Sequence, residues 1–281
     1  MNKLISFNVV GVYTFLALLS FWVIPLNFEL ALIPLYGTLF VIFPGALGAV
    51  FGKRFHNSLV RGSYMASAML ANVSTLGGVC SFILFDEKGY AYSQLIGVCQ
   101  NFLMVLLVFP LAQFFYSRHK GGDGEGGKFS LWRSIFSWNQ LSVVGMIAGL
   151  CLNANQVARP EILGSIFQSL VHVGAWIALL PVGYIINFSK AQHYRKHVLD
   201  LTAIRFVIVP VFVWFTSRMI FSDPVLNATL FILATAPTAI NAVITARLYK
   251  LRTDLAVASF IQTTAVYLLI GFPALFFLMK S

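Results

Sequence analysis

Two stretches of the sequence place small and polar residues in the middle of apolar runs that are long enough to cross a bilayer. They are 70–78, which reads LANVSTLGG, and 233–241, which reads LATAPTAIN. Such residues interrupt an apolar helix, and the backbone groups left unpaired must then be buried in protein or line a wet cavity. A half-helix that starts at a break presents free N–H groups and partial positive charge, which suit a carboxylate. Two such breaks predict an anion site near the middle of a membrane.

The candidate substrate-binding residues lie in these stretches, on the helices expected to follow them, and at one histidine. They are Asn72, Ser74, Thr75, Gln100, Asn101, His172, Thr235, Pro237, Thr238, Asn241 and Thr263. Hydroxyl and amide groups would donate to the anion, and a histidine deep within a span would neutralise it or carry a proton. The structural alternative is that these groups satisfy broken backbone or join helices, and that the histidine is neutral and bonded to a carbonyl. The sequence leaves both interpretations open.

The elements that must position these residues are membrane helices. With 59% hydrophobic and 10% charged residues among 281, the chain differs from ordinary soluble domains, which carry about 25% charged residues. Taking about 20 apolar residues per crossing, we predict an all-α polytopic membrane protein with nine transmembrane helices. Their expected ranges are 5–24, 30–50, 64–85, 90–116, 135–152, 163–188, 203–221, 225–248 and 255–279.

The distribution of Lys and Arg predicts the orientation of these spans. If the nine spans alternate, 15 of the 19 basic residues fall on one side and the other 4 on the opposite side. Because basic loops stay in the cytoplasm, we expect an inner (plasma) membrane protein with a cytoplasmic N-terminus and an external C-terminus. The net charge of +10 is thus attributed to orientation and not to nucleic-acid binding. Arg205, at the start of the seventh span, is expected to snorkel to the interface.

Short motifs recur along the chain and predict an inverted repeat. The pairs are 40–44 (FVIFP) with 206–210 (FVIVP), 70–71 with 233–234, 109–110 with 272–273, and 24–25 with 180–181. They align spans one to four with spans six to nine in opposite orientations, and they set Gln100 against Thr263. The expected units are a first repeat at 1–116, a cytoplasmic Gly-rich linker at 117–134 and a second repeat at 135–281.

Further short motifs, most of them in the second half, match one family of membrane carriers. They are 145–152, Pro160, 178–183 (ALLPVG), Pro210, 236–239 (APTA), 263–264, and Asn72 and Gly77 in an N-x4-G-x-P pattern whose proline is replaced by Val79. On these residues the chain resembles the auxin efflux carrier family, which includes plant PIN carriers and bacterial malate and malonate permeases. That family shares a superfamily with the bile acid/sodium symporters.

The resemblance implies a scaffold domain, built from spans one, two, five, six and seven, and a transport domain, built from the other four. In the transport domain, two unwound helices cross beside the substrate. Family members commonly have ten spans, so nine spans imply loss of the first. A homodimer through the scaffold is also implied. On this basis we expect a secondary carrier that moves a small organic anion, a carboxylate, across the lipid bilayer by an elevator or rocking movement.

The acidic residues and the missing motifs limit the alternatives. All nine Asp and Glu residues fall in loops or at span ends, so we expect no strong sodium site and favour a uniporter or a proton-linked carrier. A sodium-coupled symporter of bile-acid-like anions and a non-transporting membrane receptor with a carrier fold are the alternatives. No H-E-x-x-H, paired intramembrane Asp or metal-ligand spacing occurs. We therefore expect no enzyme activity, no catalytic residue, no metal and no cofactor.

Overall fold

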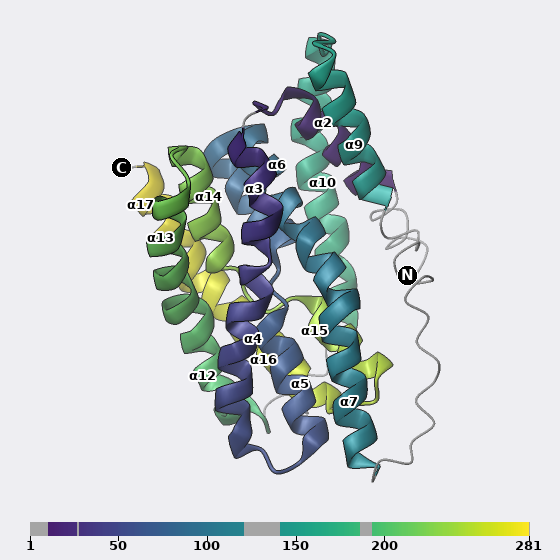
Figure 1. Cartoon of the computed structure of the whole chain (residues 1–281), viewed down its shortest axis with the longest axis vertical. Helices are drawn as coiled ribbons and strands as arrows, with labels where there is room; N and C mark the ends of the chain where they lie inside the picture. The colour runs from purple at the N-terminus through teal and green to yellow at the C-terminus, as the bar shows by residue number, and fades with distance from the viewer. Residues whose placement is uncertain (1–10, 27, 121–140, 186–192, 281) are drawn as a thin grey trace.

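The computed structural model describes residues 11–26, 28–120, 141–185 and 193–280. Within these ranges the chain is helical, and four helical runs are long and apolar enough to cross a membrane (Figure 1). They are Phe28–Arg54, Val73–His119, Arg195–Ile220 and Thr253–Met279, and shorter apolar helices occupy Tyr13–Val23, Val143–Ala154 and Pro224–Ala234. The chain therefore has the architecture of an all-α membrane protein, as its composition predicts.

Large apolar side chains cover much of the outside of this bundle. Those most exposed include Phe28, Leu35, Met219, Leu269 and Phe277. Exposing such a surface to water is unfavourable, because each large apolar side chain left in water forgoes about 1.5–3 kcal/mol of burial free energy. Lipid tails cover an apolar face without that cost, so this surface supports a location in a membrane.

The first part of the chain runs from α2 to α7. Its helices and turns are α2 (Tyr13–Val23), α3 (Phe28–Gly37), α4 (Leu39–Phe51), η2 (Gly52–Arg54), α5 (Ser58–Met69), η3 (Val73–Gly77), α6 (Gly78–Leu103), η4 (Met104–Val108) and α7 (Phe109–His119). Helix α5 begins where the Asn57 side chain accepts a hydrogen bond from the N–H of Leu59, as a helix cap does. It ends at Met69, because Leu70 is already extended.

The second part of the chain runs from α9 to α17. Its helices and turns are α9 (Leu141–Ala154), α10 (Glu161–Ile185), η6 (Arg195–Val198), α12 (Leu199–Ala203), η7 (Ile204–Ile208), α13 (Val209–Ile220), α14 (Pro224–Ala234), α15 (Ile240–Leu248), α16 (Thr253–Val266), η8 (Tyr267–Gly271) and α17 (Phe272–Lys280). Helix α14 begins with Pro224, whose fixed φ suits a first turn, after the Asp223 side chain has accepted the N–H of Val225. Both expected interruptions are present, one after α5 and one after α14.

Several expectations fall on residues outside the described ranges. They concern the N-terminal residues of the first span, the Gly-rich linker around 121–127, and the flanks at 135–140 and 186–188 of the fifth and sixth spans. The order of the described helices follows the order of the expected spans. The nine-span count, the inverted repeat and the membrane orientation stay predictions.

Helix α6 is bent back on itself at Asp86, which leaves helical geometry with a φ of 52° and a ψ of −147°. The two arms pack closely: a Cβ atom on Gly89 would lie 2.5 Å from the carbonyl oxygen of Ser81. Only glycine permits so close an approach. This hairpin separates the segments predicted as the third and fourth spans, and it brings the second arm against the first interruption.

Three helices widen by one π turn immediately before a proline. The turns η4, η7 and η8 each end just ahead of a residue–proline pair, at Pro110, Pro210 and Pro273. Proline has no N–H and its ring clashes with the carbonyl four residues earlier, so a wider turn lets the helix continue. Two of these sites, Pro110 and Pro273, belong to the Phe-Pro pairs that suggest the internal repeat.

Loops that the sequence places on one side of the membrane contact one another. At one end, Arg159 forms a bidentate ion pair with Glu87, with N···O distances of 2.5 and 2.9 Å. At the opposite end, Nη2 of Arg54 lies 2.9 Å from Oδ1 of Asp200. Each pair joins segments far apart in sequence, so the helices are fixed relative to one another at both ends of the bundle.

Candidate functional site

The two interrupted segments meet inside the bundle and pair through their backbones. The N–H of Asn72 donates to the carbonyl oxygen of Pro237 at 2.7 Å, and the N–H of Ala239 donates to the carbonyl oxygen of Leu70 at 2.8 Å. Together they form a short antiparallel bridge between two extended pieces of chain. Each break therefore supplies partners for backbone groups that the other break leaves without a helical partner.

Two side chains from later helices also hydrogen-bond to backbone groups at the crossing. Gln100 on α6 holds Ala71 with both ends of its amide: Oε1 accepts the Ala71 N–H at 2.9 Å, and Nε2 donates to the Ala71 carbonyl at 2.7 Å. On α16, Oγ1 of Thr263 accepts the N–H of Thr238 at 3.0 Å and donates to the carbonyl of Ser259 at 2.7 Å. Gln100 and Thr263 are both buried, and their polar atoms are committed to the backbone of the crossing.

The other hydroxyl groups of the second interruption are also occupied by backbone. Oγ1 of Thr238 donates to the carbonyl of Ser67 at 3.2 Å, and Oγ1 of Thr235 donates to the carbonyl of Ile232 at 2.7 Å. Both threonines and Pro237 are buried. For these residues the geometry corresponds to the structural alternative, in which polar groups satisfy a broken helix.

A different set of candidates keeps its side-chain groups available. Asn72, Asn101 and Asn241 are partly exposed, and none of their side chains hydrogen-bonds to another described residue. Ser74 and Thr75 lie on η3 directly after the break and are also partly exposed, with Oγ1 of Thr75 at 3.4 Å from the Tyr13 hydroxyl. Asn72, Ser74, Asn101 and Asn241 are therefore the part of the candidate list whose side chains are free to meet a ligand, whereas the Thr75 hydroxyl is shared with Tyr13.

His172 lies on α10, away from the contacts that join the two breaks. Its side chain is exposed, and its ring meets the ring of Phe82 edge to face, with 5.8 Å between centroids. Helix α10 does pack against η3 and α6. The structure thus places His172 on the helix beside the first interruption without bringing it into the hydrogen-bond network of the crossing.

Arg205 is a feature that the sequence reasoning missed, and the prediction that it snorkels to the interface is wrong. Its side chain is 1% exposed, and Nη2 donates to the carbonyls of Ala68 at 2.5 Å and Ser67 at 3.4 Å. Because α5 stops at Met69, these carbonyls have lost helical partners, and a helix C-terminus attracts a cation. The Nε atom of Arg205 is buried without a hydrogen-bond partner.

The signal for Arg205 was its position. It directly precedes the repeated motif 206–210, inside a run of apolar residues, where an ionisable group is costly and indicates function by default. No acidic side chain in the described part of the chain forms an ion pair with it. A buried positive charge therefore lies against the end of the first interrupted helix.

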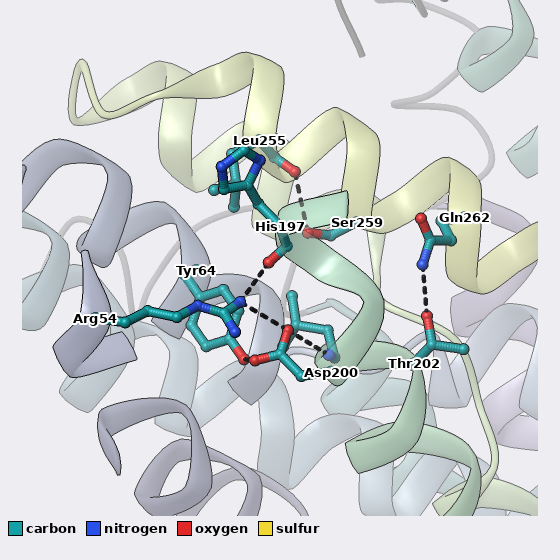
Figure 2. A network of polar contacts seen from close by, with 9 residues as sticks. Arg54, Tyr64, His197, Asp200, Thr202, Leu255, Ser259 and Gln262 are labelled. Atoms are coloured by element: carbon teal, nitrogen blue, oxygen red, sulfur yellow. Dashed lines mark hydrogen bonds and ion pairs between the residues drawn. The ribbon is translucent and has the colours of Figure 1, made fainter. Parts of the chain in front are cut away.

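A second polar network joins the same elements nearer one end of the molecule. The Tyr64 hydroxyl of α5 donates to Oδ2 of Asp200 at 2.5 Å, and Arg54 binds the other carboxylate oxygen (Figure 2). On α16, Nε2 of Gln262 donates to Oγ1 of Thr202 at 2.9 Å. Figure 2 shows both sets of contacts reaching from α5 and α16 to the short helix α12. Sequence patterns indicate no such pairing, because the partners are distant along the chain.

Neither a comparison with protein-family models nor one with curated proteins finds a match to this chain. The geometry of the crossing therefore supplies the evidence about function. That geometry consists of two paired breaks, free amide side chains beside them and one buried guanidinium.

Proposed function

We propose that the protein is a secondary transporter that carries a small organic anion across its membrane by alternating access. The observation that carries the proposal is the backbone pairing of the two interrupted helices, Asn72 to Pro237 and Ala239 to Leu70, within a bundle of apolar helices. Broken helices are tolerated at membrane depth only inside protein or beside a wet cavity. Paired broken helices are typical of substrate sites in transporters.

The charge around the crossing favours an anion. Two half-helices begin at the breaks, one with η3 and α6 and the other with α15, and each presents the positive end of its dipole. Arg205 adds a full positive charge that no carboxylate of the described residues pairs. The free amides of Asn72 and Asn241, one from each break, would donate to a carboxylate held between the half-helices.

The same groups support a carrier that does not depend on sodium. In the described residues, the side chains at the crossing are amides, hydroxyls and a guanidinium, and they hydrogen-bond to backbone groups and not to a carboxylate. A sodium site built only from neutral oxygens beside a guanidinium would be weak. We expect uptake to proceed equally with sodium or with choline in the buffer.

The contacts of α12 and its continuation suggest where movement occurs. Arg205 follows α12 and donates a hydrogen bond to a backbone carbonyl at the end of α5. Asp200 of α12 accepts a hydrogen bond from the Tyr64 hydroxyl of α5. If α5 and α16 belong to a moving transport domain and α12 to a fixed scaffold, as in auxin efflux carriers, these bonds cross the sliding interface. They would then form in one state of the cycle and break in the other.

The proposal is tested with purified protein and proteoliposomes. Mono- and dicarboxylates are screened by thermal shift, and the best stabiliser is used in uptake assays with and without sodium. Asn72→Ala and Asn241→Ala should each lower uptake markedly at limiting substrate while leaving folding intact, and Asn155→Ala, an exposed asparagine in a loop, is the matched control. Uptake at the wild-type rate by both variants, or no uptake of any carboxylate by the wild type, would contradict the proposal.

A further inference from the structure

A cavity of about 200 Å³ lies at the end of the molecule where α4 ends, α5 begins and α7 ends. Figure 1 shows these three ends together at the lower edge of the bundle. Its lining includes the basic residues Lys53, His56, Arg61 and Arg118, together with Ser58 and Phe115. No Asp or Glu is among the lining residues. The cavity is therefore strongly positive.

The cations of this cavity have no counter-charge in the described part of the chain. Lys53, Arg61 and Arg118 form no ion pair there, whereas the neighbouring Arg54 is paired with Asp200. The Nε atom of Arg61 is buried without a hydrogen-bond partner. Like charges gathered in a partly buried space repel one another, and an anion between them removes that cost.

The opposite end of the molecule is built differently. There Lys88 lies 2.8 Å from the carboxylate of Asp223, and Arg159 is paired with Glu87. Arg218, near the same end, forms no ion pair in the described part of the chain, and its guanidinium lies over the Trp214 ring. What distinguishes the cavity is that four basic side chains gather in it with no carboxylate among its lining residues.

The backbone adds to the positive field and fixes the cavity walls. Helix α5 begins at Ser58, so its N-terminal N–H groups and the positive end of its dipole lie at the cavity. A Cβ atom on Gly62 would lie 2.9 Å from Cβ of Phe115, so α5 and α7 approach as closely as glycine allows. Arg61 stacks over the Phe115 ring at 5.7 Å. The close packing of α5 and α7 therefore fixes Arg61 and the backbone that carries Arg118 before any ligand arrives.

We infer that this cavity binds a phosphate group. Phosphate presents several oxygens and up to two charges, which matches an arrangement of guanidinium, ammonium and imidazole donors at a helix N-terminus. A carboxylate offers two oxygens and one charge and would leave most of these donors unused. The group would belong either to the headgroup of an anionic phospholipid, since basic pockets at the ends of membrane helices bind such headgroups, or to a free phosphate-bearing solute. The inference is independent of the proposed transport.

The test uses a variant whose fold is not at risk. Lys53 and Arg118 are both exposed, so the double substitution Lys53→Gln with Arg118→Gln removes two charges without disturbing packing. The control is Arg218→Gln with Arg252→Gln, which removes two exposed charges elsewhere. Thermal unfolding in neutral detergent is followed in two arms at constant ionic strength: titration with inorganic phosphate, and titration with phosphatidylglycerol against phosphatidylcholine.

Phosphate, phosphatidylglycerol or both should stabilise the wild type and the control, and the cavity variant should bind at least about tenfold more weakly, since it lacks two charged donors. A response to phosphatidylglycerol alone assigns a lipid headgroup, and a response to inorganic phosphate assigns a free solute. The inference is overturned if neither probe stabilises the wild type beyond chloride, if the cavity variant responds like the control, or if malonate stabilises through the cavity as strongly as phosphate.

Discussion

The backbone N–H of Asn72 lies 2.7 Å from the carbonyl oxygen of Pro237, so a hydrogen bond joins the two interrupted helices directly. Neither break could persist alone among apolar helices, because an unpaired backbone group in such surroundings costs several kcal/mol. The two breaks are therefore one structural unit. Substitutions at its supports should have effects that depend on which backbone group loses its partner.

Gln100→Leu should destabilise the protein strongly. The change removes the acceptor for the Ala71 N–H and the donor to the Ala71 carbonyl, and it leaves both buried. A buried group without its partner costs about 1–3 kcal/mol. The free energy of unfolding, measured by titration in mild denaturant, should therefore fall by at least that amount. Gln113→Leu, a partly buried glutamine on α7, is the control and should change stability little. Equal stability of the two variants would show that Gln100 does not support the crossing.

Thr263→Val and Thr264→Val form a matched pair on one helix. Thr263 accepts the Thr238 N–H, whereas Oγ1 of Thr264 is buried without any partner. Valine is close to threonine in shape, so it removes a needed acceptor at the first position and an unsatisfied hydroxyl at the second. We expect a loss of about 1–3 kcal/mol for Thr263→Val and no loss for Thr264→Val. Thr263→Ser should keep wild-type behaviour, and a Thr264→Val variant that is the less stable of the two would contradict this assignment.

Arg205 separates a substrate role from a purely structural one. Arg205→Gln removes the charge and weakens the bond to Ala68, while Arg205→Lys keeps the charge but loses the planar donor group. If the charge attracts the transported anion, KM should rise about tenfold or more in Arg205→Gln and less in Arg205→Lys. If Arg205 only caps α5, both variants should lose stability and keep the wild-type KM in the folded fraction.

Asp223 should make the stability of the protein sensitive to acid. Burial alone would raise the pKa of its carboxyl, but hydrogen bonds from Lys88 and Tyr92 outweigh burial and hold the pKa below its ordinary value. A depressed pKa contributes stability that is fully present above the unfolded value of about 3.9 and is lost as the pH falls through the folded value. Unfolding temperature should therefore fall below about pH 4. Asp223→Asn should reduce this fall of the unfolding temperature at acid pH, whereas Glu161→Gln, at an exposed site, should leave it unchanged.

Composition and spacing predicted the helical membrane architecture and the location of both interruptions, because polar and small residues in an apolar run have a direct local consequence for a helix. The same local logic explains why Gln100 and Thr263 were singled out, since each follows its break at a corresponding position. It could not decide between backbone support and ligand contact. That choice depends on which side chains the folded chain buries, and Gln100 and Thr263 are buried while Asn72 and Asn241 are not.

Arg205 shows the limit of such reasoning most clearly. Its position near the start of a span suggested an interfacial side chain, yet the face of the helix on which it lies is packed against the end of α5. The pairing of Tyr64 with Asp200 is equally invisible in the sequence, because it depends on the packing of α5 against α12. Tertiary contacts of this kind determine whether a polar side chain is buried or exposed, and a single sequence does not show them.

The measurement that tests the central claim most directly is a double-mutant cycle on anion affinity, with Asn72→Ala, Asn241→Ala and the combined variant titrated by calorimetry with the carboxylate that best stabilises the wild type. If the two asparagines bind one anion between the paired breaks, each single variant should bind about tenfold more weakly, and the combined loss should be less than the sum, because the first substitution already disrupts the shared site. Wild-type affinity in both single variants would contradict the claim that the crossing is the substrate site.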